Sequence, residues 1–130
     1  MLLAEDEAAV RESTREFLAL HGYVVLEATS GTEALTVARE YDRTIHLMIA
    51  DVVMPQMGGA KLAAELLSDR PDMRVLFVSG YAETTFQRHG AIDVTTRFLQ
   101  KPFSLKTLAR KIREVLDTDT RALAASAGSG

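Results

Sequence analysis

The sequence predicts one doubly wound α/β domain built on a parallel sheet of five strands. Three observations lead to this fold class. The chain has 130 residues, enough for one hydrophobic core and too few for two. Short apolar runs are each bounded by polar or turn residues, as strands buried in a parallel sheet are. Amphipathic segments alternate with these runs, and such alternation favours helices on both faces of the sheet.

The apolar runs give the expected strands. These are Leu2–Ala4, Val24–Leu26, Leu47–Ala50, Val75–Val78 and Phe98–Leu99. Right-handed crossovers restrict how parallel strands can follow one another. Five strands fit the order 2-1-3-4-5 of flavodoxin-like (βα)5 folds better than the six-stranded dinucleotide-binding order.

Helical spacing and end signals predict the helices between these strands. In the first helix, Gly22 is the expected residue just past the C-terminus, and the inward positions are Val10, Thr14, Phe17 and Leu18. Ser30 and Glu33 have the spacing of a capping box that opens the second helix, whose inward positions are Ala34, Leu35 and Ala38.

The second half of the chain contains two strong helix signals and one weak one. After Gly58 and Gly59, an apolar stripe is formed by Leu62, Ala63, Leu66 and Leu67. The last helix has Ser104 as its N-cap and a longer stripe made of Leu105, Leu108, Ala109, Ile112, Val115 and Leu116. The segment from Glu83 to Arg88 predicts a fourth, weakly amphipathic helix.

The domain is expected to occupy residues 1–118. Residues 119–130 end in Ala-Ser-Ala-Gly-Ser-Gly and have the composition of a flexible tail, a linker or a cloning remnant. The sequence also begins abruptly inside the first strand, as a module excised from a longer protein would.

Composition argues against several functions. The net charge is −3 without a long basic stretch, so we expect no direct contact with nucleic acid. The absence of cysteine excludes disulfides, thiol catalysis and cysteine-based zinc sites, and fits a cytoplasmic protein. No apolar run is long enough to cross a bilayer, and no signal-peptide pattern opens the chain, so no membrane contact is expected.

The residues that follow four of the expected strands carry the functional prediction. Glu5 and Asp6 follow the first strand, Asp51 the third, Ser79 the fourth and Lys101 the fifth. In the order 2-1-3-4-5 these four strands are neighbours, and ligands of open α/β sheets bind at the carboxyl ends of the strands. We therefore expect three carboxylates, one hydroxyl and one ammonium group to meet at one edge.

Such a cluster suits phosphoryl transfer to a carboxylate. Clustered carboxylates repel one another unless a cation lies between them, and oxygen ligands without His or Cys favour Mg²⁺, or Mn²⁺ in its place. Lys101 and Ser79 would then contact the phosphoryl oxygens, with Asp51 as the nucleophile. One such residue alone is more often a turn residue or a solvated charge. The combination at four strand ends favours the functional interpretation.

The pattern resembles the receiver domain of two-component response regulators over residues 1–117. The matching segments are Glu5-Asp6-Glu7, Asp51-Val52-Val53-Met54-Pro55, Ser79-Gly80-Tyr81 and Lys101-Pro102-Phe103. The resemblance implies that Asp51 accepts a phosphoryl group from the phosphohistidine of a histidine kinase or phosphotransfer domain, with Lys101 and Ser79 assisting. The domain would thus be an acceptor that phosphorylates itself, with at most slow autodephosphorylation, and not an enzyme.

The resemblance also implies the metal ligands. Asp6 and Asp51 would bind Mg²⁺ directly, Glu5 mostly through water, and Val53 through its backbone carbonyl. Receivers usually have Asp where this chain has Glu5, so the metal geometry would be adjusted. The Lys101-Pro102 bond is expected to be cis.

The remaining implications concern switching and phosphoryl lifetime. Ser79 and Phe98 match the switch residues of receivers, which act on the surface formed by the fourth helix, the fifth strand and the last helix. A homodimer could form through the same surface. Val53 and Tyr81 stand where receivers tune the lifetime, and because Val53 has no polar group to orient water, we expect slow hydrolysis.

Further segments resemble receivers attached to hybrid sensor histidine kinases. They are Val78-Ser79-Gly80-Tyr81-Ala82-Glu83, Arg88-His89-Gly90 and Phe98-Leu99-Gln100-Lys101-Pro102-Phe103-Ser104. A parent chain of that kind would be a histidine kinase.

Three alternatives stay open. A haloacid-dehalogenase phosphatase needs an acid two residues after its nucleophile, where this chain has Val53, and 130 residues leave no room for a cap domain. A flavin carrier of the same strand order would place its phosphate on the loop that here contains Glu5 and Asp6, which would repel it. A receiver-like module that binds without being phosphorylated would not need the complete set of acids, hydroxyl and lysine.

Overall fold

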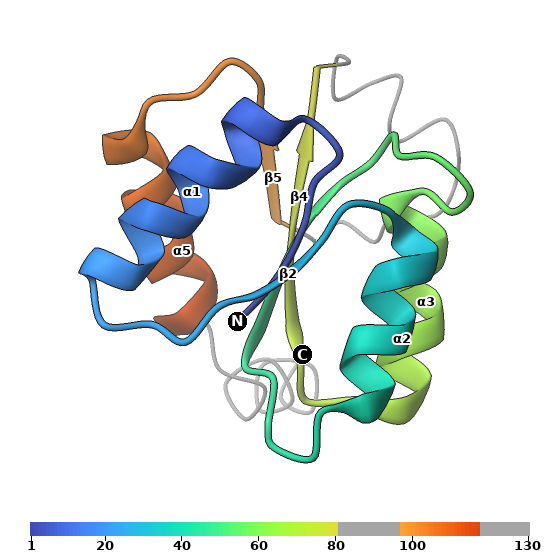
Figure 1. Ribbon diagram of the computed structural model, residues 1–130. Coiled ribbons are helices and arrows are strands. Elements are labelled where there is room, and N and C mark those ends of the chain that lie inside the picture. Colours follow the sequence, from blue (N-terminus) through green and yellow to red (C-terminus); the bar gives the residue numbers. More distant parts are fainter. Residues whose placement is uncertain (81–96, 118–130) are drawn as a thin grey trace, which may run out of the picture.

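The computed structural model describes residues 1–80 and 97–117, and five strands within them form one parallel sheet in the order β2-β1-β3-β4-β5 (Figure 1). The strands are β1 (Leu2–Ala4), β2 (Leu26–Ala28), β3 (Leu47–Asp51), β4 (Arg74–Ser79) and β5 (Arg97–Gln100). The helices are α1 (Ala8–Leu20), α2 (Gly31–Glu40), α3 (Gly59–Asp69) and α5 (Leu105–Asp117). The predicted fold class and strand order are confirmed.

The helices form a layer on each face of the sheet (Figure 1). Successive side chains of a strand point to opposite faces, so β3 serves both layers. Met48 and Ala50 belong to a core cluster with the buried faces of α2 and α3. Leu47 and Ile49 belong to a second cluster with residues of α1 and α5. All five residues of β3 are buried, so this central strand is a rigid support for whatever follows it.

The second strand differs from its predicted position. The sequence predicted Val24–Leu26, but β2 spans Leu26–Ala28 and pairs with β1 through Leu26↔Leu2 and Ala28↔Ala4. Val24 is 68% exposed. The apolar run misled the prediction because β2 is an edge strand with no neighbouring strand on one side, where a polar residue such as Glu27 is tolerated.

The predicted helix ends are largely confirmed. Gly22 has a φ of +85°, as expected for the residue that follows a helix C-terminus. The Ser30 hydroxyl accepts the Glu33 N–H at 3.1 Å. The reciprocal bond of the capping box is absent: the Glu33 carboxylate instead accepts the N–H of Thr29, at 3.0 Å.

The helices α3 and α5 follow their predicted stripes except at Leu67 and at Leu105, which is 40% exposed in the first turn of α5. Ser104 caps α5 by accepting the Thr107 N–H at 3.1 Å, and Leu108, Ile112 and Val115 are buried. In α3, Leu67 is 36% exposed because it lies at the margin of the stripe whose centre is Leu62 and Leu66.

The helix predicted from Glu83 to Arg88 and the tail predicted from residue 119 onward lie outside the described residues. Within the described part of the chain, no helix has the length and apolar character that crossing a bilayer would require.

Candidate functional site

Strand register brings the predicted site residues to the same edge of the sheet. Ala4 of β1 pairs with Ala50 of β3, so Glu5 and Asp51 each come one residue past that pair. Asp51 in turn pairs with Val78 of β4, and Ser79 is the next residue. The last pair is Ser79 with Gln100 of β5, followed by Lys101. The predicted convergence is therefore produced by parallel pairing along four neighbouring strands.

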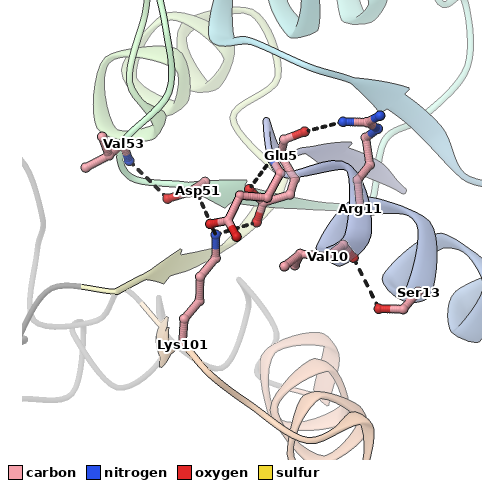
Figure 2. A network of polar contacts seen from close by, with 8 residues as sticks. Glu5, Val10, Arg11, Ser13, Asp51, Val53 and Lys101 are labelled. Carbon is pink, nitrogen blue, oxygen red and sulfur yellow. Dashed lines mark hydrogen bonds and ion pairs between the residues drawn. The ribbon is translucent and has the colours of Figure 1, made fainter.

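The centre of the site is the ammonium group of Lys101. Its Nζ lies 2.7 Å from Oδ2 of Asp51 and 2.8 Å from Oε1 of Glu5. A third contact of 2.7 Å joins Nζ to Oε1 of Glu7 in the loop before α1. Figure 2 shows Lys101 reaching from the end of β5 toward Asp51 and Glu5. The lysine thus compensates the negative charge of carboxylates that come from two other elements.

Burial shifts the ionisation of this cluster. The pKa of Glu5 is raised to about 7, chiefly because its carboxyl is buried; the hydrogen bond from Lys101 lowers this pKa and the neighbouring Asp51 raises it. Burial alone would lower the pKa of Lys101, but hydrogen bonds to three carboxylates outweigh burial and raise that pKa above its ordinary value. Lys101 therefore stays charged, whereas Glu5 ionises less readily than an exposed glutamate does.

The backbone around Asp51 is held tightly. The N–H of Val53 donates to Oδ1 of Asp51 at 3.1 Å and fixes the carboxylate orientation. Gly59, which opens α3, lies so close to this segment that a Cβ on it would be 2.4 Å from the Asp51 carbonyl oxygen. In the segment between Asp51 and Gly59, the Met57 N–H donates to the Pro55 carbonyl at 2.7 Å. The residue between these two, Gln56, has a φ of +70°. This tight three-residue turn was not predicted, because Gln gives no signal for positive φ.

Three of the predicted acids could share a metal ion. Carboxylate oxygens of Glu5, Asp6 and Asp51 all lie within 4.8 Å of one another. These are hard oxygen donors, and two of them are buried, so the donor set fits Mg²⁺ better than a metal that prefers nitrogen or sulfur. The described residues thus provide the carboxylates that were predicted to bind the ion.

The remaining predicted residues, apart from Tyr81, lie on β4, on β5 and in the segments that follow β3 and β5. Ser79 is fully buried at the end of β4, and its carbonyl accepts the Lys101 N–H at 2.8 Å. Phe98 pairs with Phe77 and packs against the cluster beneath α2 and α3. The Lys101-Pro102 bond is cis, as predicted. Tyr81 lies outside the described residues. The switch and lifetime roles of Ser79, Phe98, Val53 and Tyr81 remain predictions, as does the Val53 carbonyl as a metal ligand.

Sequence reasoning missed two residues that contact the site. Glu7 was quoted only as part of a motif, yet it binds Lys101. Arg11, in the second turn of α1, donates from Nη1 to the backbone carbonyl of Glu5 at 3.0 Å (Figure 2). The available signal was that Glu7 and Arg11 follow Glu5 closely in the sequence. The first residues of a helix can turn back over the loop that precedes it.

The family model described as the response regulator receiver domain matches residues 1–113. The sensor kinase CckA of Brucella abortus is 46% identical to the chain over 117 residues, which are 90% of this chain and 12% of that protein. The chain therefore spans a small part of that relative. The response regulator receiver protein CpdR of the same organism is 30% identical over 116 residues, covering 89% of this chain and 95% of CpdR.

Solved structures agree with the sequence comparison. The crystal structure of the receiver domain from the hybrid histidine kinase CckA superposes with a TM-score of 0.75 at 38% identity, covering 88% of this chain and 96% of that one. The response regulator receiver domain of Methanospirillum hungatei gives 0.74 at 30% identity, covering 89% and 91%. The predicted similarity to receivers of hybrid sensor kinases is confirmed.

Proposed function

The chain belongs to the response regulator receiver domain family of two-component systems, and we propose that Asp51 is the residue that accepts the phosphoryl group. The donor would be the phosphohistidine of a histidine kinase or of a phosphotransfer domain. One observation carries the proposal. The carboxylate of Asp51 lies 2.7 Å from the Lys101 ammonium group, within a cluster of acids able to hold a divalent ion.

The proposed transfer is a displacement at phosphorus. An Asp51 carboxylate oxygen attacks, a P–O bond forms, and the P–N bond to the donor's imidazole breaks with its electron pair returning to nitrogen. Lys101 stabilises the charge that spreads over the phosphoryl oxygens, and the buried hydroxyl of Ser79 donates to one of them. The Val53 N–H keeps the carboxylate oriented toward the incoming group.

A divalent ion completes this site in the proposal. Asp6 and Asp51 would bind Mg²⁺ directly, Glu5 through water, and Val53 through its carbonyl; Mn²⁺ could replace Mg²⁺. When bound, the ion supplies positive charge to the phosphoryl oxygens. The raised pKa of Glu5 supports this assignment, because a buried carboxyl that ionises reluctantly gains from a nearby cation.

The phosphorylated state would be recognised by partners through a change in the surface of the domain. Phosphorylation would draw Ser79 toward the phosphoryl group and allow Phe98 to turn inward, which alters the surface of β5, α5 and the segment between β4 and β5. That surface would bind downstream partners or a second copy of the chain. The domain acts in this scheme as a cytoplasmic acceptor that hydrolyses its phosphoryl group slowly, and not as an enzyme, although a hybrid parent protein would be a histidine kinase.

Mass spectrometry tests the proposal directly. Incubation with a small phosphodonor and Mg²⁺ is expected to add the mass of one phosphate to the wild-type chain, and to leave Asp51→Asn unchanged. Asp69→Asn is the matched control, because that carboxylate lies on the exposed side of α3 and binds Arg39. Phosphate incorporation by Asp51→Asn at the wild-type rate would refute the assignment.

A further inference from the structure

Arg11, on α1, contacts both β2 and the acidic loop that follows β1, which contains Glu5, Asp6 and Glu7. Its guanidinium group donates from Nη1 to the Glu5 carbonyl at 3.0 Å, and its Nε lies 3.7 Å from Oε1 of Glu27 on β2. The side chain is only 17% exposed. Arg11 therefore connects α1, the end of β1 and the edge strand, and Figure 2 shows it on the side of Glu5 away from Lys101.

One of these contacts is made with the peptide group between Glu5 and Asp6. The N–H of Glu5 donates to the Ala28 carbonyl at 3.0 Å, and its C=O accepts from Arg11. Both backbone polar groups of Glu5 are thus held, one by the sheet and one by a side chain. The peptide that follows leads directly to Asp6, whose exposed carboxylate contributes to the cluster with Glu5 and Asp51.

We propose that Arg11 is a positioning residue for the divalent-cation site. It holds the Glu5–Asp6 peptide in the orientation that directs Asp6 toward Asp51, and it does so without touching the ion. This inference rests on the proposed function, because it assumes that the acids bind the ion. Residues that orient metal ligands typically contribute a factor of about 10 to 100 to metal affinity.

The direction of the change in Mg²⁺ affinity separates a positioning role of Arg11 from a simple charge effect. The Arg11 guanidinium is a positive charge near a cation site, so removing that charge should by itself strengthen Mg²⁺ binding. Loss of a positioning contact should weaken binding. The two explanations predict opposite signs, and the measured direction distinguishes them.

The chain also contains a matched control for the role of Arg11 in the fold. Arg15 lies one turn further along α1 and binds Oε2 of the same Glu27 at 3.4 Å. The structure gives it no contact with Glu5 among the described residues. Arg15→Met therefore removes a positive charge and a Glu27 contact from the same helix while leaving the acidic loop tethered.

Isothermal titration of the full chain with MgCl2 at fixed ionic strength tests the proposal. Arg11→Met, which keeps the aliphatic stem, is expected to bind Mg²⁺ about tenfold more weakly than the wild type. Arg11→Lys, which keeps a donor and a charge, is expected to recover part of that loss. Arg15→Met is expected to stay within about twofold of the wild type. Circular dichroism in EDTA checks that each variant is folded.

Each result has one interpretation. Mg²⁺ affinity in Arg11→Met equal to or above the wild-type value would overturn the positioning role, and so would an equal loss in Arg15→Met. If Arg11→Met does not fold, Arg11→Lys decides, since its single ammonium group is expected to weaken Mg²⁺ binding measurably and unchanged affinity would overturn the proposal. A wild-type chain that binds no Mg²⁺ would refute the metal site itself, and this inference with it.

Discussion

Nζ of Lys101 and Oδ2 of Asp51 lie 2.7 Å apart, although 50 residues separate them in the sequence. The lysine comes from the end of β5 and the aspartate from the end of β3, with β4 between them. Their contact is partly buried. Because the two residues end different strands, the positive charge reaches Asp51 only when β3, β4 and β5 are paired in the sheet.

Replacement of Lys101 is expected to destabilise the protein most when metal is absent. Lys101→Met leaves the buried carboxylates of Glu5 and Asp51 without their cation, which should lower the free energy of unfolding by about 3 kcal/mol in EDTA. Excess Mg²⁺ should restore part of this loss. Urea unfolding with and without Mg²⁺ measures both effects. Lys106→Met on the exposed side of α5 is the control, and equal losses in the two variants would contradict the prediction.

Mg²⁺ is expected to stabilise the folded chain through Asp6. At a concentration one hundred times its Kd, the ion should raise the free energy of unfolding by about 2.7 kcal/mol. Asp6→Asn should remove most of this gain at the same Mg²⁺ concentration, whereas Asp42→Asn, at an exposed position after α2, should keep it. Chemical unfolding across a Mg²⁺ series gives the comparison. A full gain in Asp6→Asn would exclude that carboxylate as a ligand.

Loss of the Glu7 charge is expected to change stability little and to leave Lys101 held by two acids in place of three. The Glu7 side chain is 58% exposed, so its ion pair should contribute less than about 1 kcal/mol. Glu7→Gln removes one of three acids that hold the ammonium group, and phosphoryl incorporation from a small donor should be at least as fast as in the wild type. Rates from mass spectrometry, with Glu12→Gln as the control, provide the test. A strong decrease confined to Glu7→Gln would assign Glu7 a direct part in the transfer.

A methyl group at Gly59 is expected to distort the phospho-acceptor segment. Alanine normally favours a helix over glycine by about 1 kcal/mol. Here its Cβ would lie 2.4 Å from the Asp51 carbonyl oxygen, so Gly59→Ala should instead destabilise the protein by about 1–3 kcal/mol. Mg²⁺ affinity should fall as well, because Asp51 moves. An unchanged or higher midpoint of urea unfolding would show that the contact relaxes freely.

Val53 is expected to slow hydrolysis of the phosphoryl group. Its apolar side chain is 51% exposed, and its N–H binds the Asp51 carboxylate, so the residue lies beside the reacting group without a polar side-chain atom to orient water. Val53→Asn should shorten the lifetime of phosphorylated Asp51, because the Asn amide can orient an attacking water. The decay of the phosphorylated mass over time is the measurement. Val24→Asn, far along the chain and exposed, should decay at the wild-type rate.

Short-range patterns in the sequence determined the class of fold and predicted which residues lie together at the edge of the sheet. Alternating apolar runs and amphipathic stretches predicted the parallel sheet, because burial on both faces requires continuous apolar strands. Reading the residue after each strand then predicted Glu5, Asp6, Asp51, Ser79 and Lys101. These residues lie close together because parallel pairing turns strand ends into spatial neighbours, whereas their roles in phosphoryl transfer remain predictions.

Tertiary structure decided the features that depend on contacts distant in sequence. The pairing of Leu26 with Leu2 placed the edge strand two residues beyond its predicted start, since register follows hydrogen bonding and not local hydropathy. The contact of Arg11 with the Glu5 carbonyl and the close approach of Gly59 to Asp51 likewise have no local signature. A sequence shows which groups are available at the strand ends, whereas their orientation is set by backbone and side-chain contacts that form only when helices pack on the sheet.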